Sequence, residues 1–140
     1  MSRILGVDYG TRRIGLALSD PTGTLASPLP FLENNGNEKV AAQLKELVRI
    51  QEIDTVVVGL PRNMDGTYGP SAQRVREFIT QIQPQIPAKI IPQDERLTTS
   101  QASKDLAQMG LNQKDLRKKV DSSSAALILQ QFLDRSQAHP

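Results

Sequence analysis

The order of hydrophobic and polar residues predicts three strands at the start of the chain. Arg3–Tyr9 is a short β-rich run, and Ile14–Asp20 alternates apolar with small residues, a pattern typical of two strands in a hairpin. Thr24–Leu32 is predicted as a third strand. It is expected at a sheet edge, because its two prolines cannot donate backbone hydrogen bonds.

The pattern then changes to alternating helices and strands. One helix is predicted from the apolar stripe Val40, Leu44, Leu47 and Val48, and the uninterrupted run Thr55–Leu60 is typical of a strand buried on both faces. The later elements are a helix with the stripe Val75, Phe78, Ile79 and Ile82, a strand over Ala88–Pro92, a helix after Thr98 and a last helix beginning near Asp121. Three antiparallel strands followed by crossovers imply an α/β fold, with one mixed five-stranded sheet and helices on both sides.

Composition narrows the possible chemistry. The 140 residues, 38% of them hydrophobic, are expected to form one domain spanning 1–140. The chain has no cysteine, and its single histidine, His139, lies in a polar tail, which argues against thiolate and histidine catalysis. Hydrolytic chemistry would therefore rest on carboxylates. No apolar run has the length of a membrane span, so we expect a soluble cytoplasmic protein without a membrane partner.

Most of the 15 carboxylates fit helix faces, turns or polar connections, but a few do not. Asp8 lies near the end of the first strand and points to one sheet face, where an unpaired charge is costly. The pair Asp94 and Glu95 follows the fifth predicted strand, and Asp121 lies one helical turn before Ala125 on the apolar helix face. Ligands gather beyond the carboxyl ends of parallel strands, so we expect these acids to converge.

Each of these acids also has a purely structural explanation. The explanations are a helix N-cap for Asp121, an ion pair with Arg96 or a cap of the third helix for Asp94 or Glu95, and an ion pair with Arg12 or Arg13 for Asp8.

A carboxylate cluster without histidine or cysteine favours Mg²⁺ or Mn²⁺, and two such ions can activate water against a phosphodiester. Basic residues lie beside the candidate acids, and another lies in the turn-rich loop Gly59–Gly69, which could equally be a plain surface loop. The candidate nucleic-acid contacts are Arg12, Arg62, Arg96, Lys118 and Lys119. Aromatic residues outside the predicted core are few, chiefly Tyr9 and Tyr68, which favours contacts to the phosphate backbone over base stacking.

Four segments resemble, in chain order, the motifs of the YqgF-type family. They are Gly6–Ala17, Val58–Pro61 with Met64–Gly66, Asp94–Thr99, and Asp121–Ala126. The resemblance spans nearly the whole chain and implies an RNase H-like fold. It implies a nuclease that matures the precursor of 16S ribosomal RNA, acting on precursor rRNA in contact with ribosomal particles. By resemblance, Asp8, Glu95 and Asp121 are the catalytic acids and the ligands of Mg²⁺ or Mn²⁺.

Other functions stay open at this point. The family has also been interpreted as a Holliday junction resolvase acting on branched DNA, which would need a dimer to cut two strands symmetrically. A noncatalytic RNA-binding assembly factor with the same fold is a further alternative. The segment from Asp8 to Thr11 also resembles the phosphate loop of actin-like ATPases and sugar kinases, but those proteins need two such domains. The sequence leaves the oligomeric state open.

Overall fold

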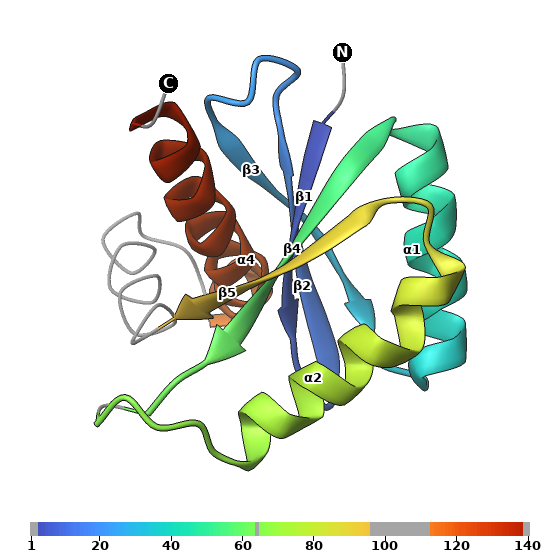
Figure 1. Cartoon of the computed structure of the whole chain (residues 1–140), viewed down its shortest axis with the longest axis vertical. Coiled ribbons are helices and arrows are strands. Elements are labelled where there is room, and N and C mark those ends of the chain that lie inside the picture. The colour runs from blue at the N-terminus through green and yellow to red at the C-terminus, as the bar shows by residue number, and fades with distance from the viewer. Residues whose placement is uncertain (1–2, 64, 96–112, 139–140) are drawn as a thin grey trace.

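The computed structural model describes the backbone of residues 3–63, 65–95 and 113–138, and their side chains except those of residues 95, 113–123 and 137–138. The elements in chain order are β1 (Arg3–Tyr9), β2 (Arg13–Ser19), β3 (Ala26–Glu33), α1 (Asn37–Ile50), β4 (Ile53–Pro61), α2 (Pro70–Ile82), the 3₁₀ turn η1 (Gln83–Gln85), β5 (Lys89–Glu95) and α4 (Gln113–Ala138) (Figure 1).

The strands form one mixed sheet in the order β3-β2-β1-β4-β5. β1 pairs antiparallel with β2, and β2 with β3, whereas β4 pairs parallel with both β1 and β5. The predicted mixed five-stranded sheet is therefore confirmed. The predicted ends of the first four strands agree with the structure within two residues.

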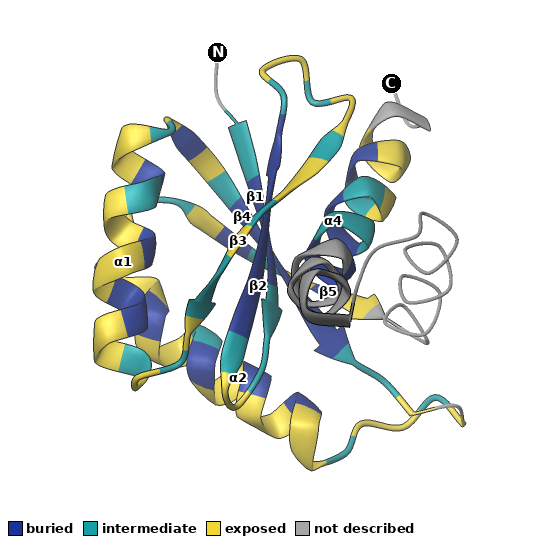
Figure 2. Ribbon diagram, turned by 180° about the vertical axis from the view of Figure 1, so that it is seen from behind, coloured by how far each residue is buried: buried dark blue, intermediate teal, exposed yellow. Residues whose placement is uncertain are grey.

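Helices cover both faces of the sheet, as the sequence predicts. α1 and α2 lie on one face and α4 on the other, and the buried residues of each helix turn toward the sheet (Figures 1 and 2). The Val56–Val58 run is fully buried, which agrees with a strand covered on both sides. No helix in the described ranges is long and apolar enough to cross a membrane.

Small residues bring α4 close to the centre of the sheet. Gly6 of β1 pairs with Ala17 of β2, and a Cβ atom added at Gly6 would lie 2.8 Å from both the Ala125 carbonyl oxygen and the Leu129 Cβ. Ala17, Ala125, Leu129 and Leu133 form the small core on this face. The absence of a side chain at Gly6 therefore sets the distance between β1 and α4.

The predicted start of the last helix is wrong. α4 begins at Gln113, eight residues before Asp121. The stretch before Asp121 is rich in lysine, leucine, arginine and glutamine, which all have high helix propensity, and it extends the helix by two turns. The helix predicted after Thr98 begins outside the described residues.

The predicted end of the fifth strand is also wrong. β5 continues beyond Pro92 to Glu95, because Asp94 and Glu95 pair with Leu60 and Pro61 of β4. β5 is an edge strand, where a proline is tolerated because one side of the backbone lacks a strand partner. Both acids therefore lie within the sheet rather than in the loop after it.

The turn between β2 and β3 is organised by one carboxylate. Asp20 Oδ1 accepts hydrogen bonds from the backbone N–H groups of Thr24 (2.8 Å) and Leu25 (2.9 Å), and Asp20 Oδ2 accepts one from the Thr22 hydroxyl. These hydrogen bonds favour the charged form, those from Leu25 and Thr22 most strongly, and lower the pKa of Asp20 to about 2 from its ordinary 3.8.

We expect this turn to lose stability in acid. Because the folded-state pKa is depressed, the contribution of Asp20 is fully present above about pH 4 and is lost as the pH falls toward 2. A carboxyl titration followed by NMR should give a midpoint near pH 2 for Asp20, and the Asp20→Asn variant should lose less stability over this window. A midpoint near 3.8 would contradict the hydrogen-bond pattern.

Candidate functional site

The carboxyl ends of the three parallel strands lie at one edge of the sheet. Val7 of β1, Val58 of β4 and Pro92 of β5 are level in the register. Asp8 lies one residue beyond this line and Glu95 three residues beyond it, with only β4 between their strands. Neighbouring strands are about 4.8 Å apart, so the backbones of the two acidic positions are separated laterally by roughly 10 Å.

Asp8 lies on the sheet face covered by α4. Leu5 and Val7 belong to the core on the α1 and α2 side, whereas Gly6 contacts α4, so alternation places Asp8 with Gly6. Asp8 is half-buried and pairs across the sheet with Gly15 of β2. The predicted inward orientation of this acid is confirmed.

A buried glutamine ties β5 to α4 on this same face. Gln93 is 5% exposed, and its Nε2 donates a hydrogen bond of 2.7 Å to the carbonyl oxygen of Ile128. Ile128 lies within the helix that carries Asp121. β1 and β5 therefore both contact α4, Gly6 from one strand and Gln93 from the other.

The direction of α4 places Asp121 toward the carboxyl edge of the strands. Farther along the helix, Gln130 accepts a hydrogen bond from the Ala26 N–H and donates one to the Thr24 carbonyl oxygen, at the start of β3. β3 runs parallel to β1, so this contact lies at the opposite edge of the sheet. Figure 1 shows the N-terminal part of α4 beside the tips of β4 and β5. Since Asp121 is inside the helix, its interpretation as an N-cap is wrong.

The predicted cations occupy different places. Arg12 is exposed in the turn after β1, and Lys118 and Lys119 belong to α4 just before Asp121. Arg62 directly follows β4. Arg96 lies outside the described residues. All four described positions therefore follow β1 or β4 or precede Asp121 near the same edge.

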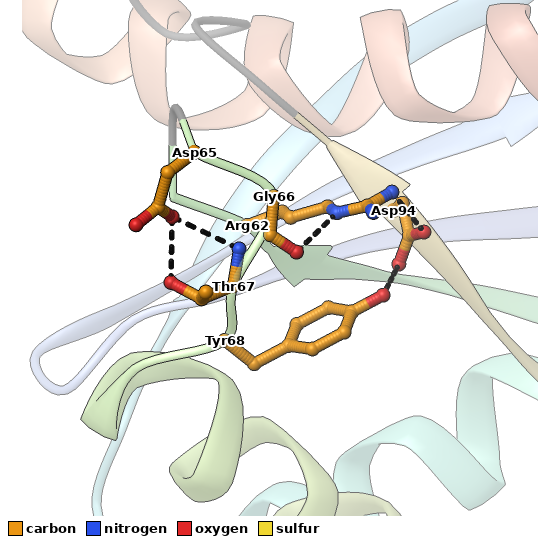
Figure 3. Close-up of polar contacts among 6 residues, drawn as sticks. All are labelled: Arg62, Asp65, Gly66, Thr67, Tyr68 and Asp94. Atoms are coloured by element: carbon orange, nitrogen blue, oxygen red, sulfur yellow. Dashed lines mark hydrogen bonds and ion pairs between the residues drawn. The ribbon is translucent and has the colours of Figure 1, made fainter.

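Arg62 and Asp94 join a polar cluster that the sequence did not predict (Figure 3). Asp94 Oδ2 accepts a hydrogen bond of 3.2 Å from Arg62 Nη1, and Asp94 Oδ1 accepts one of 2.7 Å from the Tyr68 hydroxyl. Arg62 Nε donates to the Gly66 carbonyl oxygen at 2.8 Å. Asp94 is therefore bound to the loop after β4, whereas Arg96, the partner suggested by the sequence, lies outside the described residues.

Tyr68 is tied into this cluster and is not a free stacking surface. The hydrogen bond to the Asp94 carboxylate favours the neutral phenol and raises the pKa of Tyr68 above its ordinary value of 10. The guanidinium carbons of Arg62 and Arg76 lie 5.6 and 4.7 Å from the ring centroid. No local signal could reveal this set, because its members come from a loop, a helix and a distant strand.

No group of three or more histidine, cysteine, aspartate or glutamate side chains that could hold a metal occurs among the described residues. Of the three predicted metal ligands, Asp8 is the one whose side chain is described; Glu95 and Asp121 are placed by their backbone alone.

Comparisons with known proteins identify the family. The family described as "RuvX: Holliday junction resolvase" matches residues 2–135. A protein of Sulfurihydrogenibium sp. named "Putative pre-16S rRNA nuclease" is 44% identical over 137 residues, covering 96% of this chain and 92% of the relative. One of the same name from Moorella thermoacetica is 43% identical over 133 residues, covering 95% of each chain.

Two solved structures share the fold. Fowlpox virus resolvase in complex with Holliday junction DNA has a TM-score of 0.56 at 14% identity, covering 96% of this chain and 98% of that one. Thermus thermophilus RuvC in complex with a Holliday junction substrate has a TM-score of 0.55 at 14% identity, covering 97% and 96%. These likenesses establish the RNase H-like fold expected from the sequence. Because the family match and the close relatives both span nearly the whole chain, this chain belongs to the RuvX family of nucleases, the family whose YqgF-type motifs its sequence resembles.

Proposed function

We propose that this protein is a metal-dependent endonuclease that processes the precursor of 16S ribosomal RNA. The observation that carries the proposal is that β1, β5 and α4, which bear Asp8, Glu95 and Asp121, meet on one face at the carboxyl edge of the sheet. The names of the close relatives support precursor rRNA as the substrate.

Strand alternation supports convergence of the three acids. Glu95 lies two residues after Gln93, so strand alternation puts it on the sheet face of Gln93, which contacts α4. Asp94 belongs to the opposite face and contacts the loop after β4. Asp121 precedes Ala125 by one helical turn, and Ala125 lies against Gly6, two residues before Asp8. All three acids are therefore expected on the same side of the sheet.

The donor set fits a hard divalent cation. Three carboxylates without histidine or cysteine supply only oxygen ligands, which suit Mg²⁺ and Mn²⁺. When bound, such ions activate water and stabilise the charge that develops on the leaving oxygen of a phosphodiester. Asp8, Glu95 and Asp121 would hold the cation, while Arg12, Lys118 and Lys119 would orient the phosphates beside it.

Resolution of Holliday junctions is the second candidate function. The description of the matching family and the two solved resolvase structures favour it. Symmetric cutting of a four-way junction needs two active sites, so this function predicts a dimer on the DNA.

The test compares substrates and metals directly. The purified chain is incubated with a precursor 16S rRNA transcript, a transcript with mature ends and a four-way DNA junction, each with Mg²⁺, Mn²⁺ or chelator. We expect metal-dependent cleavage of the precursor alone. The rate should be at least about 100-fold lower for Glu95→Gln, because stabilisation of the transition state by the metal is worth several kcal/mol.

Asp54→Asn is the matched control, because Asp54 is an exposed acid near the start of β4, at the opposite edge of the sheet. Cleavage of the junction alone would favour a resolvase. Metal-independent binding of the precursor without cleavage by the wild type would identify a noncatalytic assembly factor.

A further inference from the structure

Two arginines share one aromatic ring beside the proposed site. Arg62 follows β4 and Arg76 lies in α2, and their guanidinium carbons are 5.6 and 4.7 Å from the centroid of the Tyr68 ring. We propose that this Arg62–Tyr68–Arg76 stack is a second phosphate-binding site, which holds a backbone phosphate of the nucleic acid away from the bond being cut. The inference rests on the proposed function for its substrate, but its test does not require cleavage.

The charge of the stack is not balanced. Both oxygens of Asp94 are occupied, one by Arg62 and the other by the Tyr68 hydroxyl. Within the described ranges, the Arg76 guanidinium makes no hydrogen bond or ion pair, and it lies over the Tyr68 ring. Two guanidinium groups and one carboxylate leave one positive charge, and the five N–H donors of Arg76 stay available for an anion.

The chemistry of the stack favours phosphate over a base. A guanidinium is planar and binds phosphate oxygens in pairs, which makes arginine the preferred residue for such contacts. Tyr68 is 40% exposed, but its ring already interacts with the two cations, which disfavours the stacking of a nucleobase on it. The ring instead holds the guanidinium groups in place through cation–π attraction.

The position of the stack suits a nucleic acid that crosses the sheet edge. Leu60 pairs with Asp94 and Pro61 with Glu95, so Arg62 directly follows the residue opposite Glu95. Asp94 and Glu95 are adjacent in β5, so they belong to opposite faces of the sheet. The stack therefore lies beside the acidic positions but toward the α2 side, where a strand leaving the proposed site can place its next phosphates.

Binding is measured by fluorescence anisotropy with a labelled RNA hairpin carrying single-stranded flanks, in chelator, over a series of salt concentrations. Arg76→Ala should weaken binding about 10-fold near 0.1 M salt and reduce the slope of log Kd against log salt by about 0.7 to 0.9, the value for one phosphate contact. Arg76→Lys should restore the slope. Tyr68→Phe, which keeps the ring, should bind within about 2-fold of wild type, whereas Tyr68→Leu should resemble Arg76→Ala.

Arg135→Ala is the matched control. Arg135 is exposed in the last turn of α4 toward the opposite sheet edge, and its guanidinium makes no ion pair or hydrogen bond among the described residues. If Arg76→Ala and Arg135→Ala give the same affinity and slope, or if Arg76→Ala loses affinity without a change in slope, the phosphate site is refuted. If Arg76→Ala reduces the slope of log Kd against log salt while the wild type cleaves none of the substrates, the phosphate site is supported and only the proposed nuclease function is overturned.

Discussion

Replacing Asp8 with asparagine should abolish metal-dependent cleavage and leave the metal-free protein at least as stable as the wild type. In the proposed site, Asp8, Glu95 and Asp121 place like charges close together when no cation is bound. Two unit charges about 5 Å apart repel by roughly 3 kcal/mol at an effective dielectric constant near 20. Asparagine is nearly isosteric with aspartate and removes this repulsion, but it is a poor ligand for a hard cation.

Thermal melts with and without Mg²⁺ or Mn²⁺, run beside the cleavage assay, measure both effects. The metal should raise the melting temperature of the wild type more than that of Asp8→Asn, because binding to the folded state is weakened in the variant. If Asp8 instead serves as the anion of an ion pair with a neighbouring arginine, its neutralisation leaves a cation uncompensated and costs stability. A variant that melts well below wild type in chelator and still cleaves RNA would end the catalytic assignment.

Replacing Gly6 with alanine should destabilise the protein by about 1 to 3 kcal/mol and lower cleavage further than the loss of folded protein explains. The added Cβ would lie 2.8 Å from the Ala125 carbonyl oxygen and from the Leu129 Cβ, both on α4. Neither is the far end of a flexible side chain, so the helix itself must move away from β1. That movement displaces Asp121, which α4 carries, relative to Asp8.

Urea unfolding gives the change in the free energy of unfolding. The cleavage rate is measured without urea, at a temperature where the variant is fully folded. Gly69→Ala is the control, because a Cβ there would lie 3.5 Å from the nearest atom, Asn63 Nδ2, at an ordinary contact distance. An unchanged urea midpoint for Gly6→Ala would show that α4 does not depend on this close approach.

Local periodicity was sufficient for most of the fold. The alternation in Ile14–Asp20 predicts a strand because a two-residue period can be read without knowing the partner strand, and the uninterrupted Val56–Val58 run predicts a strand buried on both faces. The alternation of side chains along a strand also correctly orients Asp8 toward the sheet face it occupies. These features depend on neighbours within a few residues, so they are visible in the sequence.

Features made by contacts between distant segments were not visible. Asp94 and Glu95 carry no local strand signal, and they are in β5 because they pair with the end of β4. Tyr68 and Asp94 are 26 residues apart, and Arg76 joins them from a different element, so no spacing rule predicts the stack. The start of α4 differs from the prediction for another reason, since the basic run before Asp121 consists largely of helix-forming residues that extend the helix toward its N-terminus.

The sequence by itself determined the order of the described strands and helices, the residue types available for chemistry and the family motifs, because these depend on residue type and short-range periodicity. Only the tertiary structure decided which helix covers Asp8, how far β5 extends and which groups surround Tyr68. Those outcomes are set by strand pairing and by the close packing of α4 against Gly6, in which every contact joins residues far apart in the chain.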